Sequence, residues 1–526
     1  MKLNRILKYA AVSALAFSTG LTPVSCTDDF ETLNTDQYEV DPNTLPFSAQ
    51  FKEPLSYVYA PQQNLFQYCF SLNVDLFSGY FMTPHNFNGS GNVDYALNRS
   101  FCGGMYENVY LHIFNNTRRL IASCDEQGLT DYAGMMRVVQ AYAVQMLTDV
   151  YGPVAYTSCI EDPTNGASFS YDTQQSIYNS IFELLDKALQ DFQSPKSTLE
   201  ERQSFDYWCN GDLDMWIQVA NQLKLRAALR IVKADPTLAK QKAEEAAKGA
   251  ILKQDVLINK SLSNEQTRMF EWGDSGMNAN LTTILEGFQD PRLPLYMTKN
   301  QADVECEDGK TIASGTQYLG IRGGCDLPAK PNQWGNFSKI VCSYTTALPV
   351  MMAAEGYFLR AEGRLHGWNM GGEMEGLYNT GITKSFEQWG VSLGDYLTRG
   401  DEYKPVPFTA PSGTTGSAVA ASTITIAWNA VDRDEKKLER IITQKWIAMF
   451  PEGQEAWSEY RRTGYPKLFN LYGTNASSGQ VDASGPRRIP LPSTEYDTNT
   501  TEVNKAVTDF LGGKDYGNVK LWWDKK

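Results

Sequence analysis

Aromatic and amide side chains gather in two irregular segments of this sequence. The first is rich in glycine and contains Tyr80, Phe81, His85, Asn86, Phe87 and Asn88. The second contains Trp272, Asp274, Asn278 and Asn280, with Trp334 and Asn336 further along the chain. A flat aromatic ring can stack on the apolar C–H face of a sugar, while amide and carboxylate groups bond its hydroxyl groups. These residues predict a ligand-binding surface, and simple loop packing is the alternative for each tryptophan.

Catalytic patterns are poorly represented. The chain has only three histidines, His85, His112 and His366, and contains neither an H-E-x-x-H nor a G-x-S-x-G motif. We therefore predict no catalytic residue, no metal site and no cofactor. Carboxylates are numerous enough to imagine a glycosidase pair, so an enzyme remains an alternative that assays of glycan turnover would separate from a binding protein.

The charge of the chain excludes one class of partner. The formal net charge is −14, and removal of residues 1–25, which carry three basic and no acidic residues, leaves about −17. Nucleic-acid binding needs a basic stripe that displaces counterions from phosphates, so we expect no nucleic-acid partner. The 42% of hydrophobic and 21% of charged residues are ordinary for a globular protein.

The amino terminus has the pattern of an export signal. Lys2, Arg5 and Lys8 form a basic stretch, and an apolar run too short to span a bilayer follows from 9 to 17. A small residue directly before Cys26 resembles a lipoprotein signal, although Pro23 replaces the usual leucine. We predict a signal peptide over 1–25 and acylation of Cys26. An ordinary secretory signal with an incidental cysteine is the alternative.

The other cysteines lack the spacing of metal ligands. They are Cys69, Cys102, Cys124, Cys159, Cys209, Cys306, Cys325 and Cys342, with no C-x-x-C pair among them. Cys306 and Cys325 flank a loop-like region and could form a disulfide. Most of the others lie in apolar or helical surroundings, which favours buried small hydrophobic side chains.

Helical periodicity dominates after an arm over 26–55 that we expect to be extended. Apolar residues at spacings of three and four predict helices ending at Tyr151 and over 171–192, with Asp172 as N-cap. Further helices are predicted over 212–233, 237–252, 350–365 and 438–449. Segments 260–347 and 405–427 break this rhythm, and Thr423–Ile426 alternates like a strand of a hairpin. Helices paired in this way suggest hairpins stacked as in tetratricopeptide repeats.

Several motifs, in order along the chain, resemble the SusD/RagB family. They are the segments 141–156, 216–230, 290–293, 354–363, 452–462 and 487–490. Segment 216–230 carries Trp216, Arg226 and Arg230 at the spacings of the family's most diagnostic helix. Glu455 stands where an arginine is common, so the salt bridge of that segment is not carried over. We interpret the motif residues Trp216, Arg226, Arg230, Glu355, Arg360, Glu362 and Trp457 as core packing and buried ion pairs, not as ligand contacts.

The resemblance implies a mainly α fold and a function. The expected fold is a single SusD-like domain over 26–526, in which stacked helical hairpins carry a loop-rich ligand face and a few short strands. The acidic residues after Cys26 resemble a tag for the outer leaflet of a Bacteroidetes outer membrane. The family implies a lipid-anchored, surface-exposed protein that captures an oligosaccharide or polysaccharide and delivers it to a SusC-like TonB-dependent transporter. A peptide ligand and a scaffold without a small ligand are the alternatives.

Overall fold

The computed structural model describes residues 47–86, 92–161, 168–258, 265–341, 346–413, 416–473 and 475–525. The helices and strands beyond residue 50 belong to one unit, which spans residues 51–526. Cys26, Phe87, Asn88 and Cys342 lie outside the described residues. Within those residues, no helix is long and apolar enough to cross a membrane.

Helices account for most of the regular structure. The α-helices are α3 Phe47–Ser56, α4 Gln63–Phe66, α5 Val74–Phe77, α6 Arg99–Cys102, α7 Gly104–Asn108, α8 Asn115–Gln127, α9 Thr130–Tyr151, α10 Thr157–Glu161, α11 Gln174–Asp191, α12 Leu199–Gln203, α13 Leu213–Arg230, α14 Pro236–Ala247, α15 Ala279–Phe288, α16 Leu293–Tyr296, α17 Ala353–Leu365, α18 Met374–Trp389, α19 Asp434–Ala448, α20 Gly453–Thr463, α21 Ser493–Thr498 and α22 Thr500–Phe510. Tighter or wider helical turns are η1 Gln67–Ser71, η2 Asn92–Asp94, η3 Val109–Phe114, η4 Glu265–Trp272, η5 Lys330–Asn332 and η6 Tyr396–Thr398. The mainly α class predicted from the sequence is confirmed.

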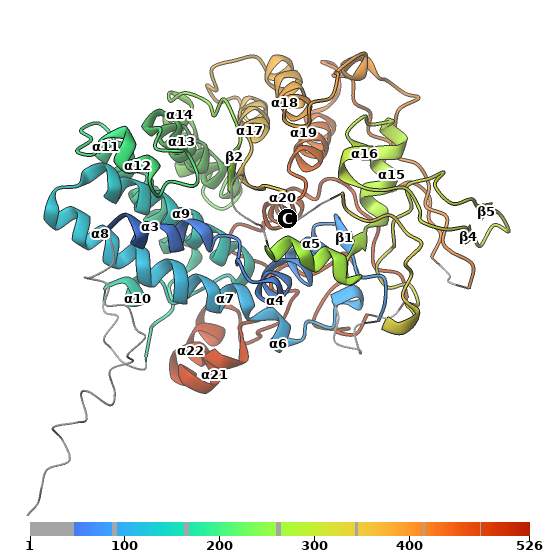
Figure 1. Ribbon diagram of the computed structural model, residues 1–526, viewed down its shortest axis with the longest axis horizontal. Coiled ribbons are helices and arrows are strands. Elements are labelled where there is room, and N and C mark those ends of the chain that lie inside the picture. Colours follow the sequence, from blue (N-terminus) through green and yellow to red (C-terminus); the bar gives the residue numbers. More distant parts are fainter. Residues whose placement is uncertain are drawn as a thin grey trace, which may run out of the picture. The chain divides into compact units, whose positions relative to one another are not determined.

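The long helices pack as successive neighbours. Helices α8 and α9 are joined by Gly128 and Leu129, and α9 then packs on α11 and α13. Helix α13 contacts α14 and α17, and α17 contacts α18 and α19. Figure 1 shows α13, α14, α17, α18 and α19 following one another in this order. Helices α15 and α16 and strands β4 and β5 lie to the right of α19 in this view. This succession of packed pairs is the helical scaffold that the sequence predicts.

The strands are short and form three antiparallel pairs among the described residues. β1 Phe81–Met82 pairs with β3 Gly276–Met277, and β2 Val256–Ile258 pairs with β6 Leu348–Met351. β4 Val304–Glu305 pairs with β5 Thr311–Ile312. The β1–β3 pair joins the two aromatic segments singled out in the sequence.

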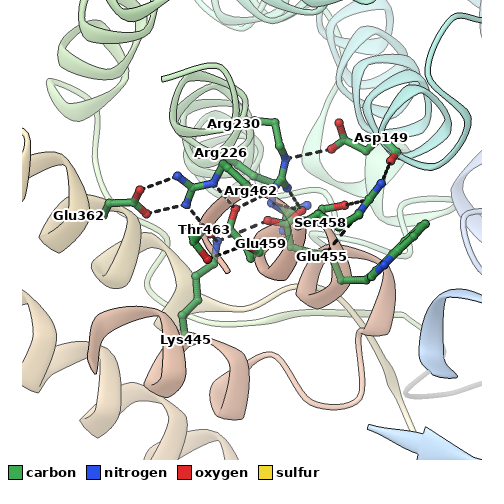
Figure 2. Close-up of polar contacts among 12 residues, drawn as sticks. Asp149, Arg226, Arg230, Glu362, Lys445, Glu455, Ser458, Glu459, Arg462 and Thr463 are labelled. Carbon is green, nitrogen blue, oxygen red and sulfur yellow. Dashed lines mark hydrogen bonds and ion pairs between the residues drawn. The ribbon is translucent and has the colours of Figure 1, made fainter. Parts of the chain in front are cut away.

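Buried charges hold the scaffold together at its centre. Arg226 and Arg230 lie on one face of α13, four residues apart, so both guanidinium groups reach the same side. Arg226 Nη2 lies 2.6 Å from Glu355 Oε2 of α17, and Arg230 contacts Asp149, Glu455 and Glu459. Figure 2 shows Asp149 of α9, the two arginines of α13 and the two glutamates of α20 converging, with Glu362 of α17 and Lys445 of α19 beside them. The structural role predicted for Arg226 and Arg230 is confirmed.

The remaining members complete this network. Arg462 binds Glu362 through two hydrogen bonds of 2.6 and 2.7 Å, and Lys445 Nζ lies 3.3 Å from Glu459 Oε2 and 3.4 Å from both Glu355 and Glu455. Glu455, at the position where the family often has arginine, therefore forms ion pairs of its own. The segment thus still carries buried ion pairs, which Glu455 forms with Arg230 and Lys445.

Several local expectations differ from the structure. The predicted extended arm ends in helix α3, and Thr173, not Asp172, caps α11 by accepting a hydrogen bond from Ser176 N. Asp172 instead accepts hydrogen bonds from Tyr156 N and Thr157 N. Cys306 and Cys325 are both buried and free, so the disulfide that their spacing allowed does not form.

Segment 423–426 is not part of a hairpin. Ile424 and Ile426 are buried, as alternation predicts, but the backbone carbonyls next to them bond to helices. Tyr378 of α18 donates its hydroxyl proton to Ile426 O, and Arg440 of α19 donates to Thr425 O. Side chains thus occupy the acceptors that a neighbouring strand would use.

Candidate functional site

The two aromatic segments predicted separately from the sequence form one region of the structure. Strand β1 pairs with β3, Asn86 N donates to Pro328 O, and Trp334 N donates to Pro84 O. Segments 81–86, 272–277 and 328–334 therefore lie against one another. We call this region the Trp272–Trp334 face.

Gly273 lies where the segments of the two tryptophans meet. Its φ of +77° is a left-handed conformation that favours glycine. A Cβ atom at this position would lie 2.4 Å from Gln333 Nε2, so segments 272–274 and 332–334 touch at this point. Trp272 precedes Gly273 and Trp334 follows Gln333, so the two tryptophans belong to segments that touch.

The two tryptophans differ in exposure. Trp272, at the end of η4, is 37% exposed and is the most exposed tryptophan of the described residues. Trp334 is half-buried and stacks on Phe337 with ring centroids 5.1 Å apart and an interplanar angle of 21°. Phe337 is itself buried, so it supports the Trp334 ring from beneath. A ring supported from beneath and a partly exposed ring are each able to stack on a flat apolar face of a ligand.

Asp274 is a buried carboxylate of this face with three polar partners. Its carboxylate lies 2.9 Å from His85 Nε2, 2.5 Å from Lys330 Nζ and 3.2 Å from Gln67 Nε2. Burial by itself would raise the pKa of Asp274, but the hydrogen bonds from His85, Lys330 and Gln67 outweigh it and hold the pKa below its ordinary value. Asp274 is only 4% exposed, whereas the Lys330 side chain is 52% exposed. The cation, not the carboxylate, is thus the charged group presented to solvent.

Sequence reasoning missed Lys330, Gln67, Gln333 and Phe337 as members of this face. Gln333 Oε1 is buried without a hydrogen-bond partner among the described residues, which makes it an acceptor available to a ligand after a small side-chain movement. Lys330 is separated from Asp274 by more than fifty residues. Its only signal in the sequence is a position inside the irregular segment 260–347.

Four of the predicted site residues have positions that serve the fold. Tyr80 is fully buried and donates its hydroxyl proton to Trp446 O, and Phe81 is 1% exposed. Asn278 caps helix α15 through Asn280 N and donates to Phe81 O, and Asn280 accepts a hydrogen bond from Phe469 N. Side chains engaged in this way present no free face to a ligand on the surface. They position the β1–β3 pair and α15 beneath the Trp272–Trp334 face.

Two other predicted residues, Asn86 and Asn336, lie at the edge of the Trp272–Trp334 face. Asn86 is exposed, next to the backbone of 328–329, and Asn336 is exposed beside Trp334. His85 is 1% exposed and acts on the face only through Asp274. Phe87 lies outside the described residues. Among the described residues, no group of three His, Cys, Asp or Glu is arranged to hold a metal ion.

Comparison with known proteins shows which family this fold belongs to. A protein-family model described as Susd and RagB outer membrane lipoprotein matches residues 29–524. No curated protein sequence matches the chain.

Three solved structures are similar over nearly their full length. A chitin-binding SusD homolog from Flavobacterium johnsoniae is 33% identical with a TM-score of 0.83, and a SusD homolog from Bacteroides uniformis is 30% identical with a TM-score of 0.83. A SusD-like protein from Bacteroides thetaiotaomicron is 30% identical with a TM-score of 0.82. Each comparison covers 91% of this chain and 99% of the other chain. On the family match and these structures together, the chain belongs to the SusD-like family of SusD and RagB outer membrane lipoproteins.

Proposed function

We propose that this protein captures an oligosaccharide at the cell surface on its Trp272–Trp334 face and delivers it, without turnover, to a SusC-like TonB-dependent transporter. The observation that carries the proposal is an exposed tryptophan and a supported tryptophan on two segments that touch, in a relative of a chitin-binding SusD homolog. Flat rings on an open surface suit an extended chain, since each ring adds a contact without requiring an enclosed pocket. We therefore expect a ligand longer than a disaccharide.

The charge of the face favours a neutral or weakly polar ligand. The mature chain carries a net charge of about −17, whose field repels strongly anionic polymers. Lys330 is one exposed cation on the face, and it is already paired with Asp274. Arg322, a second cation in the irregular segment 260–347, donates to Gly416 O and Asn470 O and stacks on Phe469 and Tyr472. Its guanidinium is thus engaged in supporting loops.

Alanine substitution of each tryptophan tests the binding surface. We expect Trp272→Ala and Trp334→Ala each to weaken binding of a chitin oligosaccharide at least tenfold, about 1.4 kcal/mol, in calorimetric titration. Trp428→Ala is the matched control, because Trp428 is a half-buried tryptophan that packs on Tyr378 away from this face. Unchanged affinity in both site variants, with intact circular dichroism, would refute the location. An array of glycans and peptides then identifies the ligand class, and turnover of any glycan would refute the absence of catalysis.

Delivery requires a partner in the same membrane. Confinement of two proteins to one plane raises their effective concentration, so even a modest interface would be well occupied. We expect a large outer-membrane barrel to co-purify with this protein from detergent-solubilised membranes, and Trp272→Ala to retain that partner while losing oligosaccharide affinity. Recovery of the protein alone would count against delivery and leave the binding proposal standing.

A further inference from the structure

A polar cavity lies beside helices α12, α13 and α18. Its volume of about 700 Å³ is within the range of about 300–1,000 Å³ that is typical of small-molecule sites. Its walls come from segments 203–215 and 253–257, from Ala353 and from one face of α18. Within the described part of the chain, it shares no lining residue with the Trp272–Trp334 face.

The loop 206–211 between α12 and α13 forms one wall and is fixed from its buried side. Asp206, which is 4% exposed, accepts hydrogen bonds from Trp208 N at 3.0 Å and from Gly211 N at 2.7 Å. It accepts a third hydrogen bond from Trp216 Nε1 at 2.7 Å. The Trp208 ring stacks on that of Trp216 with centroids 5.4 Å apart. These contacts hold the loop in one conformation without using the side chains that line the cavity from Tyr207 and Asn210.

Those two side chains remain accessible. Tyr207 is half-buried, and its ring lies 5.9 Å from Lys52 Nζ. Asn210 is exposed and has a φ of +51°, a left-handed conformation that asparagine adopts more readily than most residues. The fixed loop thus offers an aromatic ring and an amide to the cavity, and a wall that is already ordered loses little conformational entropy on binding.

The charges on the remaining walls balance one another. Lys384 and Glu387 of α18 form an ion pair, with Lys384 Nζ 2.6 Å from Glu387 Oε2. This hydrogen bond is the main cause that raises the pKa of Lys384, and the nearby charge of Asp255 raises it further. Lys253 is exposed and is the second cation of these walls. Two basic and two acidic side chains leave no net charge here, which favours a neutral ligand.

Neutral hydrogen-bonding groups make up much of the rest. The primary amides that line the cavity are Gln203, Asn210, Gln254 and Gln388. Each amide carries one acceptor and two donors, so it can bind two hydroxyl groups of a ligand at once. Gln254 is exposed, and its Nε2 contacts only the weak acceptor Met215 Sδ, at 3.2 Å, among the described residues. An accessible aromatic ring together with several amides is the set of groups that recognises a sugar.

We propose that this cavity is a second carbohydrate site, which takes a neutral disaccharide. Tyr207 stacks on the apolar face of one sugar ring, and Asn210 and Gln254 bind hydroxyl groups. An engineered cavity of about 150 Å³ holds benzene, so about 700 Å³ has room for two sugar rings with their hydroxyl groups. A hollow of this kind suits a short ligand, whereas the open Trp272–Trp334 face suits an extended chain. The cavity does not depend on that face.

Titration with disaccharides tests the proposal. The probes are N,N′-diacetylchitobiose, cellobiose and maltose, each titrated by calorimetry into the full chain carrying Cys26→Ala, which prevents acylation and removes the need for detergent. We expect saturable one-to-one binding of at least one probe, weakened at least fivefold by Tyr207→Ala. Tyr403→Ala is the matched control, because Tyr403 is also a half-buried tyrosine beside a cation, Arg399, and does not line the cavity. No binding of any probe, or equal affinities of the two variants, overturns the proposal.

Removal of the Asn210 amide gives a second test. Asn210→Gly deletes the side chain and keeps the left-handed backbone, since glycine adopts it without strain. We expect at least threefold weaker binding of the same disaccharide. Gln289→Gly is the matched control, because Gln289 is exposed, has a φ of +50° and does not line the cavity. Equal affinities of these two variants would also overturn the proposal.

A double variant separates the cavity from the Trp272–Trp334 face. We expect the chain carrying both Trp272→Ala and Trp334→Ala to bind the disaccharide as the parent does. Loss of disaccharide binding in this variant would assign the binding to that face and overturn a separate site, while the proposed function would stand. Conversely, failure of longer oligosaccharides to bind at the face would refute the proposed function and leave the disaccharide result unchanged.

Discussion

Asp75 is a buried acid whose protonation is tied to folding. Its carboxyl lies against Gly453 at the start of α20, where a Cβ atom on residue 453 would lie 2.3 Å from Asp75 Oδ1. Burial raises its pKa from 3.8 to about 8. Between these values the folded chain keeps the proton and the unfolded chain does not. Stability from this group is therefore fully present below about pH 4 and is lost as the pH rises through about 8.

We predict that Asp75→Asn flattens this pH dependence. The amide keeps the acceptor for Gly453 N–H and cannot ionise. Relative to the parent, the variant should gain stability steadily from pH 4 to pH 8, by at most about 6 kcal/mol. Urea unfolding at a series of pH values measures this difference, and Asp509→Asn at an exposed position serves as the control. A constant difference between variant and parent across this range would contradict the raised pKa.

Residue types alone predicted part of the Trp272–Trp334 face. Trp272 and Trp334 were chosen because flat aromatic rings in an irregular segment suit stacking on a sugar, with loop packing as the alternative. The contacts that join the face were not predictable, because His85, Asp274 and Lys330 come together from distant parts of the chain. Tyr80 and Phe81 have the same residue types as binding aromatics, yet the β1–β3 pair buries them. Composition cannot distinguish an aromatic platform from the core beneath it.

At the scale of elements, the spacing of charges along helices explains the buried network. Arg226 and Arg230 are four residues apart, as are Glu455 and Glu459, and Glu355 and Glu362 are seven apart. Each spacing brings its pair to one helix face. Burial alone would raise the pKa of Glu362, but Arg462 outweighs it and lowers the pKa to about 2. The helices are thus joined by ionised groups that satisfy one another.

We predict that Arg462→Met is strongly destabilising. The change leaves Glu362 and Glu459 without the guanidinium that both bind, and removal of one partner from a buried ion pair costs about 3–5 kcal/mol. Arg360→Met is the matched control on α17, because Arg360 is half-buried and, contrary to the ion pair expected from the sequence, donates to the carbonyls of Met370 and Gly249 and forms no ion pair among the described residues. Chemical denaturation of both variants measures the difference. Equal losses would mean that the network contributes no more than ordinary packing.

Long helices were predicted better than short ones. The helix predicted over 212–233 is α13, Leu213–Arg230, since Asp212 caps its first turn and a long apolar stripe follows. The helix predicted over 237–252 ends earlier, at Ala247, and Val350 belongs to β6 and not to the helix predicted from that position. Helix α15 was missed altogether within 260–347. It has only ten residues and depends on the Asn278 cap and on its close contact with Lys404 at Gly287.

At the scale of the whole molecule, the family places this chain among outer membrane lipoproteins, while the anchor itself is predicted from the sequence. We expect Cys26→Ala to abolish labelling by radioactive palmitate and to release the protein from membranes. Cys159→Ala, a matched change at a half-buried cysteine, should keep both the label and the membrane association. A Cys26→Ala protein that stays membrane-bound, with an unlabelled parent, would disprove the anchor.

The segment 521–524 covers part of the buried network of charged side chains. Trp523 is fully buried, and its ring covers the guanidinium groups of Arg230 and Arg461 at 5.5 and 5.1 Å. Asp524 lies next to Trp523 and accepts a hydrogen bond of 2.6 Å from Arg487. In the folded protein, the indole of Trp523 thus lies between these two guanidinium groups and water.

The consequence is a mutual dependence between segments far apart in the sequence. Loss of segment 521–524 would expose the guanidinium groups of Arg230 and Arg461 to water, so helices α13 and α20 depend on this segment for the burial of their charges.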